Sequence, residues 1–166
     1  MWHVQALFGI NGYRFATWDD GNQVGWFFLH FPHYHVTEPV STHPGVEVDV
    51  QQISGRGELP NLEIRLCRNG QTIAYSWVLA SEHYCLNPEA RTIFNTESFG
   101  VYEPEDRGKG LGRYLMQLKL WEMRKLGYQT ATLLSSRPNY RAQLLYTNTG
   151  YRVVDASCAF VKDMEK

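Results

Sequence analysis

Three glycines at alternate positions precede a stretch of helical spacing in the segment YEPEDRGKGLGRYL, residues 102–115. The glycines and the basic residues that alternate with them are Gly108, Gly110 and Gly112 with Arg107, Lys109 and Arg113. Such a turn gathers successive backbone N–H groups at a helix N-terminus, where the helix dipole favours negative charge. Glycine also lets an anion approach the backbone, because it has no Cβ. The segment therefore predicts a phosphate-binding turn between a strand and a helix, with the three basic side chains adding positive charge at its rim. A glycine-rich turn that holds no ligand is the alternative.

The spacing of these glycines separates them from two common phosphate motifs. A nucleoside-triphosphate loop requires GxxxxGK followed by Ser or Thr, whereas Gly108 and Lys109 are followed by Gly110. A dinucleotide fingerprint requires its third glycine at the position of Arg113, and no clear acidic residue ends a second strand about twenty residues on. The first motif is thus excluded and the second is disfavoured.

The elements around this turn alternate between strands and helices. Asn69-Gly70 is a strong hairpin signal between two apolar runs. Helical spacing between Gly110 and Gly127, and again before Gly150, predicts two helices that end at glycines. Strands are predicted at 93–102, 128–135 and 151–162. The order from residue 62 onwards predicts an α/β or α+β sheet with helices packed against it.

The first sixty residues carry weaker signals. Alternation of Val46, Val48 and Val50 with polar neighbours predicts one strand, and no amphipathic helix stands out. The aromatic residues of VGWFFLHFPHYH suit a core or a dimer interface, with a hydrophobic substrate slot as the alternative; they are Trp26, Phe27, Phe28, Phe31 and Tyr34. The histidines of that segment, His30, His33 and His35, lack an Asp, Glu or Cys partner at metal-ligand spacing, so no metal site is expected.

Composition indicates an ordinary soluble chain. Its 166 residues suit one domain, and a net charge of −1 gives no overall attraction to nucleic acid or to an anionic membrane. The three cysteines form no CxxC pair, which favours a reducing compartment. The chain start lacks the pattern of a signal peptide, and no apolar run is long enough to span a bilayer. These features together predict a cytoplasmic protein.

Two motifs in this order resemble the GCN5-related N-acetyltransferase (GNAT) family. Arg107, Gly110 and Gly112 match the acyl-CoA pyrophosphate motif of that family: Arg or Gln, two residues, Gly, one residue, then Gly or Ala. Tyr102 and Pro104 match the strand end that precedes it. The segment NYRAQLLYTNTGY matches the last helix of the family at Asn139, Ala142, Tyr146, Gly150 and Tyr151. The resemblance covers residues 62–162 and leaves the first sixty without a counterpart.

This resemblance implies a fold and a donor. The fold is a mixed, mostly antiparallel sheet whose splayed central strands are flanked by helices. The donor is acetyl-CoA, its pyrophosphate held by the backbone of Arg107, Gly108, Lys109, Gly110, Leu111, Gly112 and Arg113. The strand end at Val101 and Tyr102 would pair with pantetheine and polarise the thioester, and Asn139 would contact the CoA arm. Tyr146 would protonate the departing thiolate, a role that a phenol can fill as a general acid; a core aromatic is the alternative.

The resemblance also implies a primary amine as acceptor, on a small molecule or a protein, with direct transfer in a ternary complex. Glu97 is a candidate base, although Glu97 and Tyr102 point to opposite faces of their strand unless a bulge intervenes. Glu82 and His83 are weaker candidates. A CoA-binding module without turnover and an acyltransferase acting on a modified nucleobase are the alternatives. Dimers are frequent in the family, so the resemblance suggests a homodimer.

Overall fold

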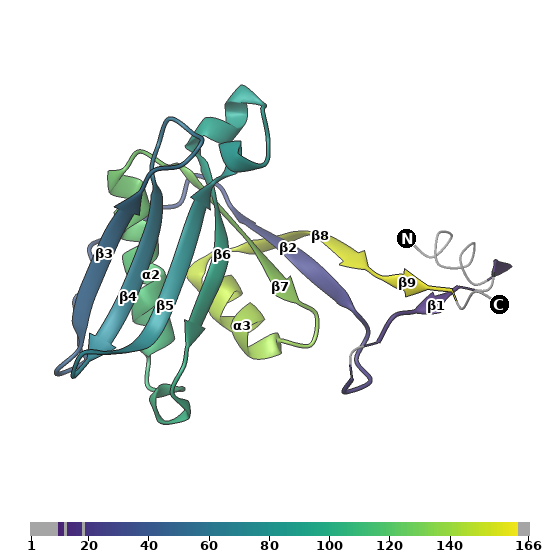
Figure 1. The fold of residues 1–166 in the computed structure, drawn as a ribbon, viewed down its shortest axis with the longest axis horizontal. Coiled ribbons are helices and arrows are strands. Elements are labelled where there is room, and N and C mark those ends of the chain that lie inside the picture. Colours follow the sequence, from purple (N-terminus) through teal and green to yellow (C-terminus); the bar gives the residue numbers. More distant parts are fainter. Residues whose placement is uncertain (1–9, 12, 18, 163–166) are drawn as a thin grey trace.

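The computed structural model describes residues 10–11, 13–17 and 19–162 (Figure 1). Its main sheet has seven strands in the order β3-β4-β5-β6-β7-β2-β8. Neighbouring strands are antiparallel, except β6 and β7, which are parallel. The strands are β2 (Gly25–Phe31), β3 (Glu47–Ile53), β4 (Asn61–Arg68), β5 (Gln71–Ala80), β6 (Ile93–Val101), β7 (Thr130–Ser136) and β8 (Arg152–Cys158). The expected mixed, mostly antiparallel sheet is confirmed.

Two α-helices of the described residues pack against this sheet, and shorter elements accompany it. The helices are α2 (Leu111–Lys125) and α3 (Tyr140–Thr149). The described part of the chain also forms the 3₁₀ helices η1 (Ser81–His83), η2 (Pro88–Thr92) and η3 (Pro104–Asp106). The strands β1 (Arg14–Phe15) and β9 (Phe160–Val161) form a two-stranded extension that reaches away from the main sheet in Figure 1.

Glycines set the turns and helix ends as the sequence predicts. Asn69 and Gly70 adopt φ values of 52° and 77°, as a tight hairpin between β4 and β5 requires. The helix α2 ends before Gly127 and α3 ends before Gly150, both with positive φ. At the start of α3, the Asn139 side chain accepts a hydrogen bond from the Ala142 N–H at 3.2 Å.

The core lies between α2 and strands β4 to β6. Alternate residues of β4 point into it and are almost fully buried: Leu62, Ile64 and Leu66. Opposite them, α2 contributes Leu111, Leu115, Met116 and Met123. Burying such side chains stabilises the fold by roughly 1.5–3 kcal/mol each. The helix is therefore held by its apolar stripe, and this fixes the glycine turn at its N-terminus against the end of β6.

The aromatic N-terminal segment forms a strand that the sequence did not predict. In Figure 1, β2 lies between β7 and β8, so an early segment completes the C-terminal half of the sheet. The strand ends at Phe31, before Pro32. Leu29 and Tyr34 are fully buried, whereas 38% of Phe28 is exposed. Part of the segment is therefore buried in the core, as expected, and Phe28 is left on the surface.

After β2, the chain crosses to the far edge of the sheet at β3. The strand predicted from Val46, Val48 and Val50 is present, and no α-helix occurs between residues 19 and 60 of the described chain. No helix of the described chain is both long and apolar enough to cross a bilayer. The expectation that the chain start carries no signal peptide falls mainly on residues 1–9, outside the described residues.

Candidate functional site

A gap opens where β6 and β7 diverge. The two strands pair in parallel from Ile93 opposite Thr130 to Thr96 opposite Leu133. Beyond that point β6 continues along β5, while β7 continues along β2 to Ser136. The predicted splay is therefore confirmed, and the facing edges of β6 and β7 leave backbone groups available to a ligand.

Tyr146 of α3 lies beside this gap. Its ring packs 6.1 Å from the ring of Phe99, which follows the last β6–β7 pair, and 6.1 Å from that of Tyr151. The side chain is buried, and burial raises the pKa of its phenol to about 12. The phenol therefore keeps its proton at neutral pH and can donate it.

The glycine turn borders the other end of the gap. Gly108 and Gly110 have φ values of 78° and 89°, and no atom lies within 4 Å of a Cβ built on Gly108. The first hydrogen bond of α2 joins the Tyr114 N–H to the Gly110 carbonyl at 3.0 Å. The N–H groups of Leu111, Gly112 and Arg113 precede it and have no acceptor within the helix. This arrangement suits an anion, and the predicted phosphate site at this turn stays a prediction.

Two of the backbone N–H groups that the sequence interpretation assigned to the donor already have acceptors within the protein, and this corrects that assignment. The Arg107 N–H donates to the Pro104 carbonyl at 3.2 Å, and the Tyr102 N–H donates to the Ile73 carbonyl of β5 at 2.9 Å. The Tyr102 amide therefore points away from the gap. Val101 occupies the alternate position opposite Ala74, so its N–H and carbonyl point towards the gap. Of the two predicted residues, Val101 has the suitable orientation.

The Arg107 side chain closes the end of β6. Its Nε donates to the Val101 carbonyl at 3.2 Å, and its Nη2 donates to the Tyr102 carbonyl at 3.1 Å. The guanidinium thus supports the turn. The sequence interpretation had placed its charge at the rim of the turn, and this is corrected. Lys109 and Arg113 are exposed beside the turn and supply its accessible positive charge.

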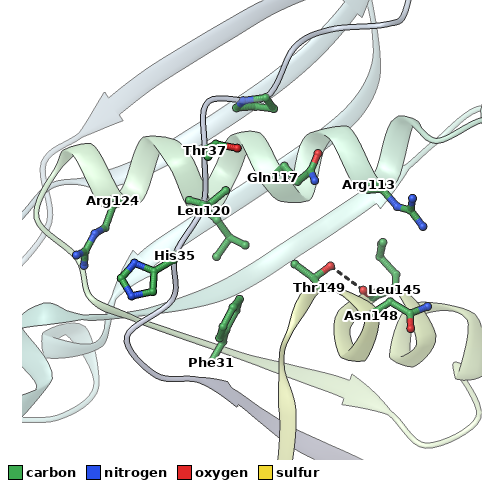
Figure 2. Close-up of a pocket in the computed structure, with 12 residues that line it drawn as sticks. Phe31, His35, Thr37, Arg113, Gln117, Leu120, Arg124, Leu145, Asn148 and Thr149 are labelled. Atoms are coloured by element: carbon green, nitrogen blue, oxygen red, sulfur yellow. Dashed lines mark hydrogen bonds between the residues drawn. The ribbon is translucent and has the colours of Figure 1, made fainter.

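A pocket of about 760 Å³ lies between α2, α3 and residues 35–39 (Figure 2). In Figure 2, Arg113 stands at the α3 side, Arg124 stands towards the opposite end of α2, and His35 and Thr37 lie across the opening. The described lining residues include no Asp or Glu. Because Arg113 follows the glycine turn, the pocket extends a positively charged surface away from that turn.

Comparisons with known proteins bear on this geometry. No protein-family model matches the sequence, and no curated protein matches it either. Among solved structures, a GCN5-related N-acetyltransferase from Sphaerobacter thermophilus superposes with a TM-score of 0.64 at 14% identity, over 94% of this chain and 54% of that one. A tandem GNAT protein from the clavulanic acid biosynthesis pathway gives a TM-score of 0.67 at 12% identity, over 92% and 56%. A GCN5-related N-acetyltransferase from Kribbella flavida gives 0.56 at 11% identity, over 90% and 60%.

The chain has the GNAT fold. It spans between 54% and 60% of the length of these three neighbours. The identities are low, so the likeness concerns the fold, and the chemistry of this chain must be argued from its own residues.

Within this GNAT fold, Glu97 occupies a bulge in β6. Ser98 pairs with Trp77 and Thr96 pairs with Val78, which leaves Glu97 as the extra residue. The bulge meets the condition under which Glu97 and Tyr102 share a face. The Asn95 side-chain amide and the Tyr84 hydroxyl both donate to the Glu97 carboxylate. The carboxylate is exposed and held in place at the point where β6 and β7 separate.

Glu82 and His83, the weaker candidate bases, make contacts of other kinds. The Glu82 carboxylate accepts the Glu58 N–H at 2.8 Å and lies 3.7 Å from Arg91 Nε, so it fastens the loop that precedes β4. His83 packs against Tyr84, with ring centroids 5.0 Å apart. No cluster of three or more His, Cys, Asp or Glu side chains in the described chain is placed to hold a metal.

The sequence interpretation missed a buried lysine in the centre of the GNAT fold. Lys119 has no exposed surface, and its Nζ donates to Thr96 Oγ1 at 2.9 Å and to the Tyr151 hydroxyl at 3.4 Å. Its Nζ also lies 5.4 Å from the ring centroid of Phe99. Burial lowers the pKa of Lys119 to about 7. One signal was available, since Lys119 follows Leu115 by four residues and precedes Met123 by four.

Asn139 stands at the N-terminus of α3, where it caps the helix. Its side-chain oxygen is engaged by the Ala142 N–H, and the residue is exposed. Its predicted contact with the CoA arm stays a prediction. The cap itself has a clear function, because it sets the start of the helix that carries Tyr146 to the gap.

Proposed function

We propose that the protein is an acetyl-CoA-dependent N-acetyltransferase that acts on a primary amine. The observation that supports this most directly is that a glycine turn at a helix N-terminus and a buried phenol border one gap in the sheet. The turn lies at the N-terminus of α2, and Tyr146 comes from α3. The exposed carboxylate of Glu97 lies at the start of the same gap.

The residues around the gap fit the chemical groups of acetyl-CoA. Its phosphates suit the free N–H groups that open α2, with Arg113 and the pocket behind it adding positive charge. Its extended amide-bearing arm suits the exposed backbone of β6 at Val101. The Val101 carbonyl oxygen already accepts one hydrogen bond from Arg107 Nε, and its second lone pair can accept another from that arm.

Acyl transfer forms an N–C bond to the amine and breaks the C–S bond of the thioester. An incoming ammonium loses two protons in the process: one before attack, and one from the nitrogen afterwards, which balances the proton that the thiolate gains. Glu97 can accept the proton of the incoming ammonium, directly or through water, because its carboxylate is exposed at the gap. Tyr146 can supply the proton that the thiolate needs, since its raised pKa keeps the phenol protonated. Backbone N–H groups along the diverging strand suit the developing charge on the carbonyl oxygen.

Isothermal titration with acetyl-CoA and with CoA tests the donor assignment. We expect a dissociation constant in the range of about 1 μM–1 mM, typical of enzyme substrates. Titration with ATP is the matched control, because it carries phosphates without the pantetheine arm, and it should bind more weakly. Failure of both acetyl-CoA and CoA to bind at millimolar concentration would overturn the proposal.

Mass spectrometry of primary amines incubated with the protein and acetyl-CoA tests turnover. We expect a product that carries one added acetyl group. Binding of CoA without any acetylated amine would leave a CoA-binding module as the function, in place of an enzyme.

A further inference from the structure

The face of the sheet opposite α2 and α3 is open to solvent in its centre. The two helices lie next to each other on one face, where they share the pocket in Figure 2. The alternate side chains of β4 and β5 point to the opposite face, which neither α2 nor α3 covers; they include Glu63, Arg65, Tyr75 and Trp77. A donor bound by the turn and the helices would reach the gap from the helix side. The opposite face therefore gives a second substrate its own approach to that gap.

An apolar pocket of about 380 Å³ lies on the β2–β6–β7–β8 part of the sheet. Its rim includes three partly exposed apolar side chains: Phe28 at 38%, Leu134 at 49% and Val154 at 62%. Leu134 pairs with Phe28 across β7 and β2, and it is the first β7 residue beyond the parallel pairing with β6. The pocket thus begins beside the gap.

Asn95 joins this pocket to the carboxylate of Glu97. Its side-chain oxygen accepts a hydrogen bond from Thr132 Oγ1 at 3.1 Å inside the pocket. Its amide nitrogen donates to Glu97 at the bulge. Both ends of the Asn95 side chain are therefore engaged, and the site places the Glu97 carboxylate next to an apolar surface.

The charges around the pocket restrict what can bind. The described lining residues include no Lys, Arg, Asp or Glu, and His30 is the one ionisable side chain among them. A charged group placed against Phe28, Leu134 and Val154 would therefore lose hydration without an ion-pair partner on that apolar surface. A second ammonium group would be equally unfavourable against Phe28 and Leu134. An ammonium at Glu97 with an uncharged apolar body in the pocket satisfies both parts of the site.

We propose that the acceptor is a primary amine on an alkyl or aryl body, with its nitrogen at Glu97 and its body in the pocket formed by Phe28, Leu134 and Val154. This inference rests on the proposed acetyltransferase function and adds the class of its second substrate. It excludes free amino acids and short polyamines as preferred acceptors, because these carry a second charge. It also gives a function to Phe28, the aromatic residue of β2 that the core leaves exposed.

Matched amines test this selectivity. Hexylamine and 2-(2-aminoethoxy)ethanol have the same chain length but differ in polarity, and 1,6-diaminohexane adds a second charge. We expect kcat/KM for hexylamine to exceed that for each of the other two by about 10-fold or more. Leu134→Gln should lower kcat/KM for hexylamine by about 10-fold and leave the dissociation constant of acetyl-CoA unchanged. Val48→Gln, at a side chain of similar exposure on β3, is the control and should change neither quantity.

Binding without the donor separates this inference from the proposed function. In a two-dimensional NMR titration with hexylamine alone, we expect the amide signals of Phe28 and Leu134 to shift, and those of β3 to stay in place. Shifts without acetylation in the presence of acetyl-CoA would preserve the amine pocket and overturn the enzyme function. Equal kcat/KM for the three amines, or the absence of shifts at Phe28 and Leu134, would overturn the pocket as the acceptor site whether or not acetyl-CoA binds.

Discussion

Arg68 and Asp106 fasten the glycine turn to the sheet. Arg68 Nη1 at the end of β4 lies 3.0 Å from both carboxylate oxygens of Asp106, which is almost fully buried in η3. The contact joins residues that are 38 positions apart in the sequence. It fixes the backbone immediately before Gly108, so the orientation of the N–H groups at the start of α2 depends on a side chain from another strand.

Replacing this carboxylate tests how much the turn depends on it. We expect Asp106→Asn to lower the free energy of unfolding by about 1–3 kcal/mol, because it weakens charged hydrogen bonds at a buried position. The dissociation constant of acetyl-CoA should rise as well, since the turn loses its anchor. Urea denaturation and isothermal titration measure the two effects. Glu105→Gln is the matched control in the same 3₁₀ helix, where the side chain is exposed; an equal loss in that variant would contradict the anchoring role.

Glycine substitutions can separate backbone strain from ligand binding. Gly108 and Gly45 have φ values of 78° and 69°, and at both positions a Cβ would meet no atom within 4 Å. Gly108→Ala and Gly45→Ala should each cost about 1–2 kcal/mol of stability, because L-residues are strained at positive φ. Gly108→Ala alone should also weaken acetyl-CoA binding, since its methyl group would stand in the proposed phosphate cradle. Equal affinities in the two variants would argue against the cradle.

The sequence predicted most of the elements from residue 62 onwards because their signals are local. The Asn69-Gly70 turn, the glycines at the ends of α2 and α3, and the alternation within β7 each depend on neighbouring residues. The resemblance to the GNAT family added the splay of β6 and β7, which no local pattern contains. In the structure, Tyr146 packs beside Phe99, which is consistent with the general-acid role that the resemblance implies; that role stays a prediction.

Features that depend on contacts between residues far apart in the sequence could not be predicted from local patterns. The place of β2 depends on pairing with residues one hundred or more positions later, and an aromatic run interrupted by Pro32 gives no such register. The hydrogen bonds of Arg107 depend on where the end of β6 lies, so its charge was misplaced at the rim of the turn. Lysine is rarely buried without a charged partner, so Lys119 was not singled out from the sequence as a core residue.

Tyr146→Phe tests the general acid. The substitution removes only the hydroxyl, so packing against Phe99 and Tyr151 is kept. We expect kcat to fall by about 10²–10⁴-fold with little change in the dissociation constant of acetyl-CoA. Release of free CoA thiol, measured with hexylamine as acceptor, gives the rate. Tyr140→Phe, at an exposed position of the same helix, should retain full activity; an equal effect there, or none at Tyr146, would contradict the assignment.

Lys119 should make stability depend on pH above neutrality. The ordinary pKa of a lysine is 10.5, and burial lowers the pKa of Lys119 to about 7 in the folded protein. Between these values the unfolded chain binds a proton at this site that the folded chain does not, so stability rises with pH. This gain in the free energy of unfolding is lost as pH falls from 10.5 through 7. The expected slope is about 1.4 kcal/mol per pH unit inside this window and close to zero below it.

Lys119→Met isolates this contribution, because other groups titrate equally in the two proteins. Urea denaturation at pH 7, 8 and 9 should give a wild-type free energy of unfolding that rises more steeply than that of the variant, by about 1.4 kcal/mol per unit. Lys125→Met is the matched control, since Lys125 is half exposed on the same helix and pairs with Glu122 at 2.6 Å. Parallel pH profiles for wild type and Lys119→Met would show that Lys119 keeps an ordinary pKa. The amine would then be reached by water, and the interior beside Tyr151 and Phe99 would be less dry than the packing indicates.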